Sequence, residues 1–273
     1  MDSVAAFRAL HENERVLVLA NAWDAATAAL FRAAGAPAIA TTSAGVAWTR
    51  GFPDGDVLPR EELFSSLREI CRASGGLPVT ADIEGGYSND PEEVASLVAD
   101  VRALGVSGIN LEDGTGSPEV LSAKIEAIKR RLKARGDDIF INSRTDIYLL
   151  ELASGETAIR EVIARAQRYA QAGADAFFVP ALDDVAAIRT IARAITIPLN
   201  ILAVPGLPTL HELRALGVRR VSAGSALAKI AYGAARRSAA AFVRGDSTEM
   251  LFDDSSVGYG ELNALFQAPA TNA

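Results

Sequence analysis

The stretch LGVSGINLEDGTGSPEVLSAKIEAIKRRLKARGDDIFINSRTD, residues 104–146, contains one complete strand–helix–strand unit. A short apolar run at 104–113 is followed by an amphipathic segment at 118–134 and by a second apolar run at 135–146. Glycine ahead of each run supplies the left-handed turn that ends a helix. Strands that alternate with helices pair in parallel through crossover connections.

The same pattern recurs along the chain and predicts eight strands. The predicted strands are 16–22, 34–42, 75–84, 104–113, 135–146, 172–181, 196–205 and 216–225. Most are apolar on both faces, as strands covered by helices should be. Eight units in 273 residues predict an α/β fold, a parallel (β/α)₈ barrel of the TIM type. The alternative is a doubly wound open sheet, which usually carries a glycine-rich phosphate turn after its first strand, and 21–24 lacks one.

The barrel is predicted to be a single domain over residues 1–273, with 244–273 as a C-terminal extension. An apolar patch at 262–266 could form a last helix that packs on the barrel or on a neighbouring subunit. No apolar run approaches the roughly 20 residues that a bilayer needs, and the first 15 residues lack the order of a signal peptide. We therefore expect a cytoplasmic protein without a membrane partner.

Composition excludes several other classes. Hydrophobic residues make up 49% of the chain, which rules out a disordered protein. The formal charge of −7 makes nucleic acid an unexpected partner. The single cysteine, Cys71, excludes an internal disulfide and lies in the predicted helix 60–74, where a core residue is expected rather than a nucleophile. The two histidines, His11 and His211, do not follow strands, so histidine base catalysis is not expected.

Acidic side chains follow three successive predicted strands, at the end of a barrel where active sites lie. Asp82 and Glu84 should share one face of their strand, Glu112 ends the next, and Asp146 follows the third. Acids crowded at one rim repel each other unless a cation intervenes, and hard oxygen ligands favour Mg²⁺ or Mn²⁺. The alternative is that these acids cap helices or face solvent, which for Asp146 alone is the preferred interpretation.

Further candidates surround these acids. The planar guanidinium of Arg144 suits a carboxylate or a phosphate, or it serves as counter-ion to Glu112 or Asp113. A predicted turn at 43–45 offers backbone N–H groups to a ligand, or it is ordinary turn chemistry. Asn200 lies within the predicted strand 196–205.

Seven motifs in this order resemble the isocitrate lyase/phosphoenolpyruvate mutase superfamily. They are NAWDAATAALFRAAG, TTSAGVA, GFPDGD, TADIEGGYSND, GINLEDG, INSRTD and NILAVPG, spread from about residue 21 to residue 225. Each motif alone is weakly specific, whereas their order and spacing together are specific. The resemblance implies a (β/α)₈ barrel whose last helix is exchanged between subunits of a homodimer or homotetramer. It also implies binding of Mg²⁺ and of an α-oxo acid or its enolate.

The resemblance also assigns roles by position. It implies a metal site made by Asp82, Glu84 and Glu112. Asp54, in the Pro-Asp loop, and Arg144, which would hold the substrate carboxylate, are the expected catalytic residues. The expected substrate-binding residues are Ser43, Ala44, Gly45, Asp82, Arg144 and Asn200.

The chain departs from the family pattern at the positions that distinguish one member's reaction from another's. Isocitrate and methylisocitrate lyases carry a Lys-Lys/Arg-Cys-Gly-His loop after the strand-four acid, and here 114–119 reads GTGSPE. The gating loop of the mutase is not seen, and 179–181 reads VPA where some members have glutamate or histidine. We therefore expect a Mg²⁺-dependent enzyme that cleaves or decarboxylates a small, oxaloacetate-type 2-oxo acid through a metal-stabilised enolate. The alternatives are phosphoenolpyruvate or phosphonopyruvate chemistry, with Arg50 as a helper, and a non-catalytic 2-oxo acid binder.

Overall fold

The computed structural model describes residues 2–246, 248–252 and 256–267. Within them, nine parallel strands form one sheet in the order β1-β9-β8-β7-β6-β5-β4-β3-β2. The first predicted strand is split into β1 (Leu17–Leu19), which pairs with β9 (Val218–Ser222), and β2 (Asn21–Ala22), which pairs with β3 (Ile39–Thr41). Only Ala20 separates the two halves, so together they join both edges of the sheet. The structure confirms the predicted TIM-type barrel, with nine strands in place of the expected eight.

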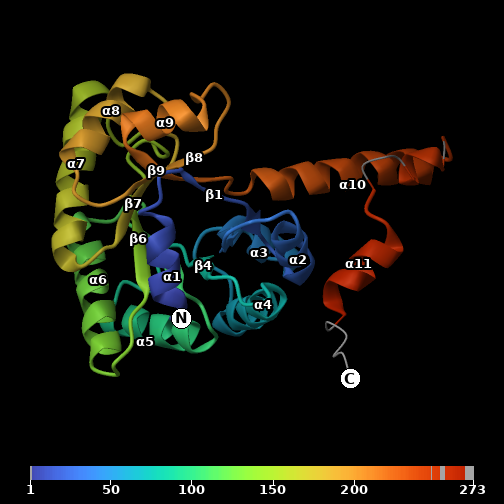
Figure 1. Ribbon diagram of the computed structural model, residues 1–273, viewed down its shortest axis with the longest axis horizontal. Helices are drawn as coiled ribbons and strands as arrows, with labels where there is room; N and C mark the ends of the chain where they lie inside the picture. Colours follow the sequence, from blue (N-terminus) through green and yellow to red (C-terminus); the bar gives the residue numbers. More distant parts are fainter. Residues whose placement is uncertain (1, 247, 253–255, 268–273) are drawn as a thin grey trace.

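The remaining elements alternate around the barrel as predicted (Figure 1). The strands are β4 (Val79–Asp82), β5 (Gly108–Glu112), β6 (Phe140–Arg144), β7 (Ala176–Val179) and β8 (Leu199–Leu202). The helices that accompany them are α2 (Ala25–Ala33), α3 (Ser43–Thr49), α4 (Arg60–Ala73), α5 (Pro91–Ala103), α6 (Pro118–Lys133), α7 (Gly155–Ala172), α8 (Val185–Ala194) and α9 (Leu210–Leu216).

Local sequence signals explain where these helices begin and end. The Asp24 side chain accepts a hydrogen bond of 2.7 Å from the Thr27 N–H and forms a capping box at the start of α2. At the other end of a helix, α7 stops at Gly173, whose φ of 108° places it in the left-handed region that a C-terminal cap requires. Between helices and strands, side chains such as Ile109 and Leu111 are fully buried and form the main core.

The predicted turn at 43–45 is instead the first turn of α3. Thr42 is the N-cap residue, and its hydroxyl lies 3.5 Å from the Gly45 N–H. The backbone after β3 therefore enters a helix directly. A Cβ at Gly45 would lie 2.7 Å from both Thr42 Cγ2 and Trp23 Cβ, so only glycine fits this close approach. The correction keeps the backbone N–H groups of this segment near the strand ends but makes them helical.

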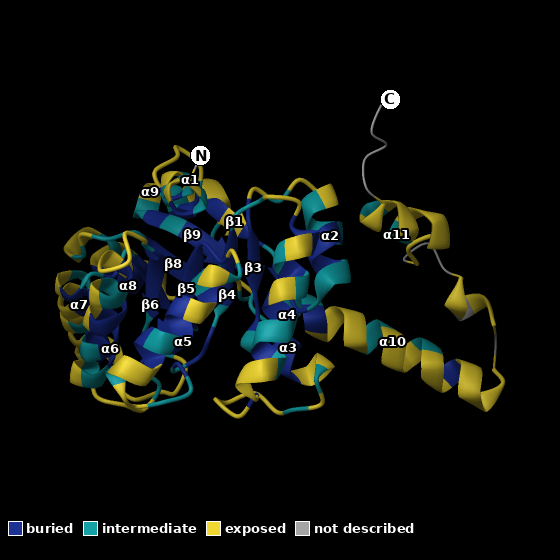
Figure 2. Cartoon of the chain, turned by 90° about the horizontal axis from the view of Figure 1, so that it is seen from below, coloured by how far each residue is buried: buried dark blue, intermediate teal, exposed yellow. Residues whose placement is uncertain are grey.

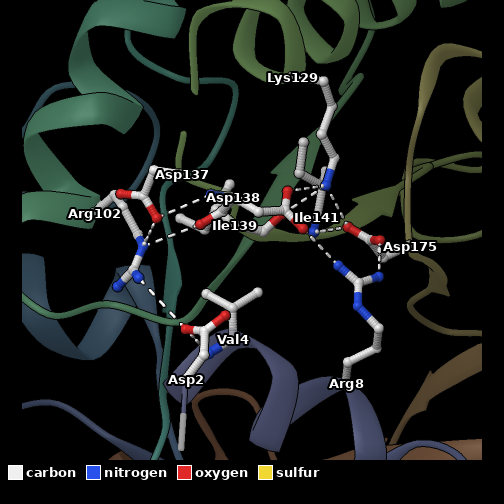
Figure 3. A network of polar contacts seen from close by, with 10 residues as sticks. All are labelled: Asp2, Val4, Arg8, Arg102, Lys129, Asp137, Asp138, Ile139, Ile141 and Asp175. Carbon is white, nitrogen blue, oxygen red and sulfur yellow. Dashed lines mark hydrogen bonds and ion pairs between the residues drawn. The ribbon is translucent and has the colours of Figure 1, made fainter. Parts of the chain in front are cut away.

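The N-terminal end of the barrel is closed by a helix and carries a network of ion pairs. Helix α1 (Ser3–Leu10) inserts Phe7, which is fully buried and packs edge-on against Phe140 at 5.2 Å. Figure 3 shows the adjoining network, in which Lys129 Nζ bonds Asp138 and Asp175, each at 2.8 Å. Arg8 contacts the same two carboxylates. Ion pairs at this end of a barrel serve stability, since active sites lie at the opposite end.

The C-terminal part leaves the barrel. Helix α10 (Ala226–Arg244) projects outward and is largely exposed along its length (Figure 2), and it presents Ile230 and Val243 to solvent. After the short 3₁₀ helix η1 (Glu249–Leu251), helix α11 (Tyr259–Phe266) returns to α2, where Arg32 Nη2 donates a hydrogen bond of 3.0 Å to the Leu265 carbonyl. The apolar patch at 262–266 thus contacts its own chain. Residues 247, 253–255 and 268–273 of the predicted extension lie outside the described residues.

None of the described helices is both long enough and apolar enough to cross a membrane.

Candidate functional site

A cavity of about 170 Å³ lies at the carboxyl ends of the strands. Five of the residues predicted from the sequence line it: Ser43, Ala44, Asp54, Asp82 and Arg144. Its apolar wall is made by Leu149, Phe178, Pro180 and Leu202. Arg144 is the one cationic side chain among the described residues that line the cavity. Four other predicted residues, Gly45, Glu84, Glu112 and Asn200, lie outside this lining.

Asp82 is the last residue of β4, and its carboxylate faces the cavity. Its Oδ2 lies 3.5 Å from the Ser43 hydroxyl, and its backbone N–H donates a hydrogen bond of 2.9 Å to the Thr41 hydroxyl. Burial raises the pKa of Asp82, the positive charge of Arg144 opposes this rise, and the nearby Asp54 carboxylate adds to it. The ionised form of this buried carboxylate would be stabilised by a cation that enters the cavity.

Glu84 does not share a face with Asp82, which corrects the prediction. Strand β4 ends at Asp82, and Glu84 has a φ of 53°, so the alternation of a strand does not extend to it. Its Oε2 accepts a hydrogen bond of 2.8 Å from the Gly55 N–H and another from the Asp56 N–H, and the Tyr87 hydroxyl donates to Oε1 at 3.2 Å. Burial raises the pKa of Glu84 to about 7. Glu84 therefore holds a neighbouring loop.

The loop that contains Asp56 also forms hydrogen bonds to the residues that follow Glu84. Asp56 Oδ1 accepts hydrogen bonds from the backbone N–H groups of Gly85 at 3.2 Å and Tyr87 at 3.1 Å. Three non-glycine residues in these two loops are left-handed: Asp56 (φ 56°), Glu84 and Tyr87 (φ 58°). Each such residue costs about 1 kcal/mol or more and is kept only when its surroundings determine it. These reciprocal hydrogen bonds join the segment that follows Asp54 to the loop after β4.

Arg144, the last residue of β6, is held by two carboxylates. Its Nη1 lies 2.5 Å from Glu112 Oε2, while Nε and Nη2 contact the two oxygens of Asp146 at 2.6 and 3.0 Å. The expectation that Asp146 caps a helix or faces solvent was wrong. Asp146 is only 3% exposed, and both of its carboxylate oxygens accept hydrogen bonds from the Arg144 guanidinium. Asp113 is not a partner of Arg144, since it bonds Arg165 at 2.7 Å and Tyr169 at 2.6 Å.

These contacts set the charge of the site. Burial opposes ionisation of Arg144, but Glu112, Asp146 and Asp82 together raise its pKa, so the guanidinium stays positive. Burial raises the pKa of Glu112, and the positive charge of Arg144 opposes that rise. Of the five N–H groups on Arg144, two donate hydrogen bonds to Asp146, while Nη1 is in ion-pair contact with Glu112, so further N–H groups remain for a ligand in the cavity.

Sequence reasoning placed Asn200 at the site, but this residue is fully buried in β8. Its Oδ1 lies 3.5 Å from the hydroxyl of Ser222, which itself lines the cavity, so Asn200 is one residue removed from it. Conversely, Asn110 lines the cavity and was not singled out, although it stands two residues before Glu112 on the same strand. The alternation of strand residues was the signal that could have found it.

The donor set suits a divalent cation held mainly by one acid. Among the described residues, no three His, Cys, Asp or Glu side chains converge as a ready-made metal site. Asp82 nevertheless offers carboxylate oxygens to the cavity, and Mg²⁺ often binds through one or two carboxylates while it keeps several waters. Glu84 and Glu112 already contact the Asp56 loop and Arg144, so they would reach such an ion directly through their remaining oxygens or through water.

Comparisons with known proteins point to one family. A family model described as phosphoenolpyruvate phosphomutase matches residues 7–243. An uncharacterized protein of Mycobacterium tuberculosis is 38% identical over 94% of this chain and 95% of its own length. The 2-methylisocitrate lyase of Escherichia coli is 29% identical over 78% of this chain and 75% of its own. The oxaloacetate decarboxylase of Rhodopseudomonas palustris is 31% identical over 55% and 52%, respectively.

Solved structures agree with these matches. A Burkholderia cenocepacia protein provisionally assigned as a lyase/mutase is 34% identical and superposes with a TM-score of 0.87, covering 98% of this chain and 96% of its own. A second protein from the same organism, provisionally assigned as a phosphonomutase, is 39% identical with a TM-score of 0.81 over 89% of this chain and 100% of its own. With its closed barrel, its strand-end acids and these matches, the chain belongs to the phosphoenolpyruvate mutase family of the isocitrate lyase/phosphoenolpyruvate mutase superfamily.

Proposed function

We propose that this chain is a Mg²⁺- or Mn²⁺-dependent enzyme that breaks a C–C bond of a small, oxaloacetate-type 2-oxo acid. The observation that carries the proposal is the cavity that Asp82 and Arg144 share at the strand ends, where Asp82 has no ion-pair partner within 4.0 Å among the described residues. A volume of about 170 Å³ suits a ligand of only a few carbon atoms. The relative named oxaloacetate decarboxylase supports this substrate class.

Each cavity residue has a chemical part in this proposal. The N–H groups of Arg144 that Asp146 does not use hold the carboxylate next to the oxo group, and the Ser43 hydroxyl with the first-turn N–H of Ala44 contacts the oxo acid oxygens. Gly45 gives that turn the room it needs against Trp23. Asp82 would hold the divalent cation, with Glu84 and Glu112 touching it directly or through water. When bound, the cation supplies positive charge where an enolate oxygen develops.

The reaction balances without a histidine or cysteine. Decarboxylation breaks the bond between C3 and its carboxylate, releases CO₂ and leaves the electron pair on the enolate, which then takes a proton at C3. Asp54 lies at the exposed edge of the cavity and would move that proton. In a hydrolytic variant the same carboxylate would take a proton from the attacking water.

The alternatives fit the cavity less well. Phosphoryl chemistry calls for further cations, but Arg50 donates to Ser66 at 2.9 Å and pairs with Glu62 and Glu69 on α4, away from the cavity. The short connection at 113–117, between β5 and α6, carries no cysteine or histidine, which disfavours the methylisocitrate lyase reaction. Phosphonopyruvate chemistry stays the second candidate, because one similar structure is assigned as a phosphonomutase.

We also propose that α10 is exchanged with a second copy in a homodimer or homotetramer. The helix projects from its own barrel, and its exposed apolar side chains include Ile230 (66% exposed), Phe242 and Val243 (83%). Apolar surface of this extent on an outlying helix is typical of an interface. Light scattering on the full chain should give a dimer or larger, and a monomer at micromolar concentration would contradict this proposal.

The function is tested by turnover of 2-oxo dicarboxylates with Mg²⁺ present, detected as pyruvate or oxalate release. Wild type should turn over at least one of them, whereas Asp82→Asn should lose activity by at least a hundredfold. The matched control is Asp100→Asn, because Asp100 pairs with Arg60 on the surface, and it should behave as wild type. Tight binding of 2-oxo acids without turnover would favour the non-catalytic binder, and turnover of phosphonopyruvate alone would favour P–C chemistry.

A further inference from the structure

Below the cavity, the barrel interior contains a fully buried arginine. Arg220 lies on β9 and is 0% exposed, with Leu17 and Asn200 as its neighbours across the adjacent strands. Burial lowers the pKa of Arg220 to about 9, while the charge of Asp82 raises it, so the side chain is still a cation at neutral pH. Among the described residues, no carboxylate lies within ion-pair distance of Arg220. Its one hydrogen-bond partner therefore indicates what this buried side chain does.

That partner is Asn110. Arg220 Nη2 donates a hydrogen bond of 3.2 Å to Asn110 Oδ1, whereas its Nε and Nη1 have no partner in the described part of the chain. A guanidinium can only donate, so the amide atom facing it must be the oxygen. Asn142 Nδ2 donates to the same oxygen at 2.8 Å. The two donors therefore fix which way the Asn110 amide points.

The fixed oxygen leaves the other end of the amide for the cavity. Asn110 lines the cavity, and its Nδ2 makes no hydrogen bond to any described residue. Its backbone is the register partner of Asp82 on β4. Two N–H donors on a neutral group thus face the cavity beside the acid, in the position from which an oxygen of a bound oxo acid would accept them.

We propose that Asn110 is a substrate-binding residue that donates to the oxo oxygen of the substrate, and that Arg220 is the positioning residue that aims it. The inference rests on the proposed function, because an oxo oxygen is the acceptor. A preorganised neutral donor stabilises negative charge as it develops on that oxygen. Arg220 touches no substrate and acts only through Asn110, so its effect on binding must vanish when the Asn110 amide is removed.

The test is calorimetric titration of the full-length protein with oxalate at saturating Mg²⁺. Loss of one well-aimed hydrogen bond should weaken oxalate binding about tenfold in Asn110→Ala. Arg220→Met should weaken it to a similar extent, and Arg220→Lys should restore most of the loss, because an ammonium can also donate to Asn110 Oδ1. In the Asn110→Ala background, Arg220→Met should cause no further loss. The control is Ser143→Ala, which removes a buried hydrogen bond to the Ala176 carbonyl from the adjacent position on β6 and should bind oxalate as wild type does.

The outcomes separate the inference from the proposed function. If wild type binds no oxalate with Mg²⁺, the proposed function fails and takes the inference with it. If wild type binds and Asn110→Ala binds equally well, only the inference fails. An Arg220→Met effect that persists in the Asn110→Ala background would show a general role in folding or charge, and would also refute the positioning role. Should Arg220→Met not fold, Arg220→Lys and Asn110→Ala still decide the outcome.

Discussion

Arg144→Lys should weaken oxo acid binding although it preserves the charge of the site. In wild type, Asp146 accepts hydrogen bonds of 2.6 and 3.0 Å from one edge of the guanidinium, and Glu112 Oε2 forms an ion pair with Nη1 at 2.5 Å. Lysine offers a single ammonium that cannot bind both carboxylates and a substrate in this geometry. It should pair with the buried acids and leave the substrate carboxylate without its donors.

The magnitude follows from the contact that the ligand loses. A hydrogen bond to a charged group contributes about 1.5–3 kcal/mol, which corresponds to roughly ten- to hundredfold in affinity. Oxalate titrations at saturating Mg²⁺ measure this difference directly. The matched control is Arg165→Lys, because Arg165 also pairs with a buried aspartate, Asp113, and its side chain has the same 14% exposure as that of Arg144. Arg165→Lys should lose stability but bind oxalate as wild type does.

Equal affinities for wild type and Arg144→Lys, with both proteins folded, would refute the reasoning. Arg144 would then only neutralise Glu112 and Asp146. The substrate carboxylate would have to be held by the cation and by the first turn of α3 instead. If Arg165→Lys lost as much oxalate affinity as Arg144→Lys, the reasoning would equally be refuted. The loss would then reflect a general destabilisation of the barrel.

Three further predictions concern single residues. Asp82→Ala should abolish the calorimetric signal for Mg²⁺ with oxalate, and unchanged binding would exclude Asp82 as a ligand. Burial raises the pKa of Cys71 to about 11, so iodoacetamide should react slowly at pH 8 and faster as the pH rises. Cys71→Ala should keep turnover within a few-fold of wild type, and loss of activity in a folded variant would reopen a thiol mechanism. Burial, with the nearby Arg220, lowers the pKa of His11 from 6.5 to about 3. At about 1.4 kcal/mol per pKa unit, this shift makes the free energy of unfolding depend on pH by roughly 4–5 kcal/mol. The unfolded state then binds the extra proton, so this stability is complete above pH 6.5 and is lost as the pH falls toward 3. Urea denaturation of His11→Gln should show a smaller loss over this window than wild type, and parallel curves would contradict the assignment.

The sequence predicted the parts of the site that depend on strand order. Active sites of barrels lie at strand ends, so Asp82 and Arg144 could be assigned to one cavity from their places after two predicted strands. The structure places both on the cavity wall. The segment 43–45 was correctly placed near them, but its conformation was not, because a strand can run into a helix through Thr42 without an intervening turn.

Side-chain direction beyond a strand end could not be predicted in the same way. Glu84 was expected beside Asp82 because both would share a face of one strand, yet β4 stops at Asp82 and the chain turns left-handed at Glu84. That turn depends on contacts with Asp56, almost thirty residues earlier in the chain. No local pattern encodes such a long-range contact, so only the folded structure shows that Glu84 holds a loop.

The barrel interior was missed for a different reason. An Arg-Arg pair at 219–220 is typical of a solvated surface, yet Arg220 is fully buried because β9 turns alternate residues inward. At the lower end of the barrel, Lys129 and Arg8 share two carboxylates, as a stable core requires. At the other end, the described non-glycine residues with a left-handed backbone all lie in connections that run from the carboxyl end of a strand to the next barrel helix: Asp56, Glu84, Tyr87, Glu151 and Ala181. Departures from local rules that gather at one end of a fold are expected at functional sites. The uneven distribution is therefore an argument, independent of any motif, that this protein does its chemistry at the carboxyl ends of the strands.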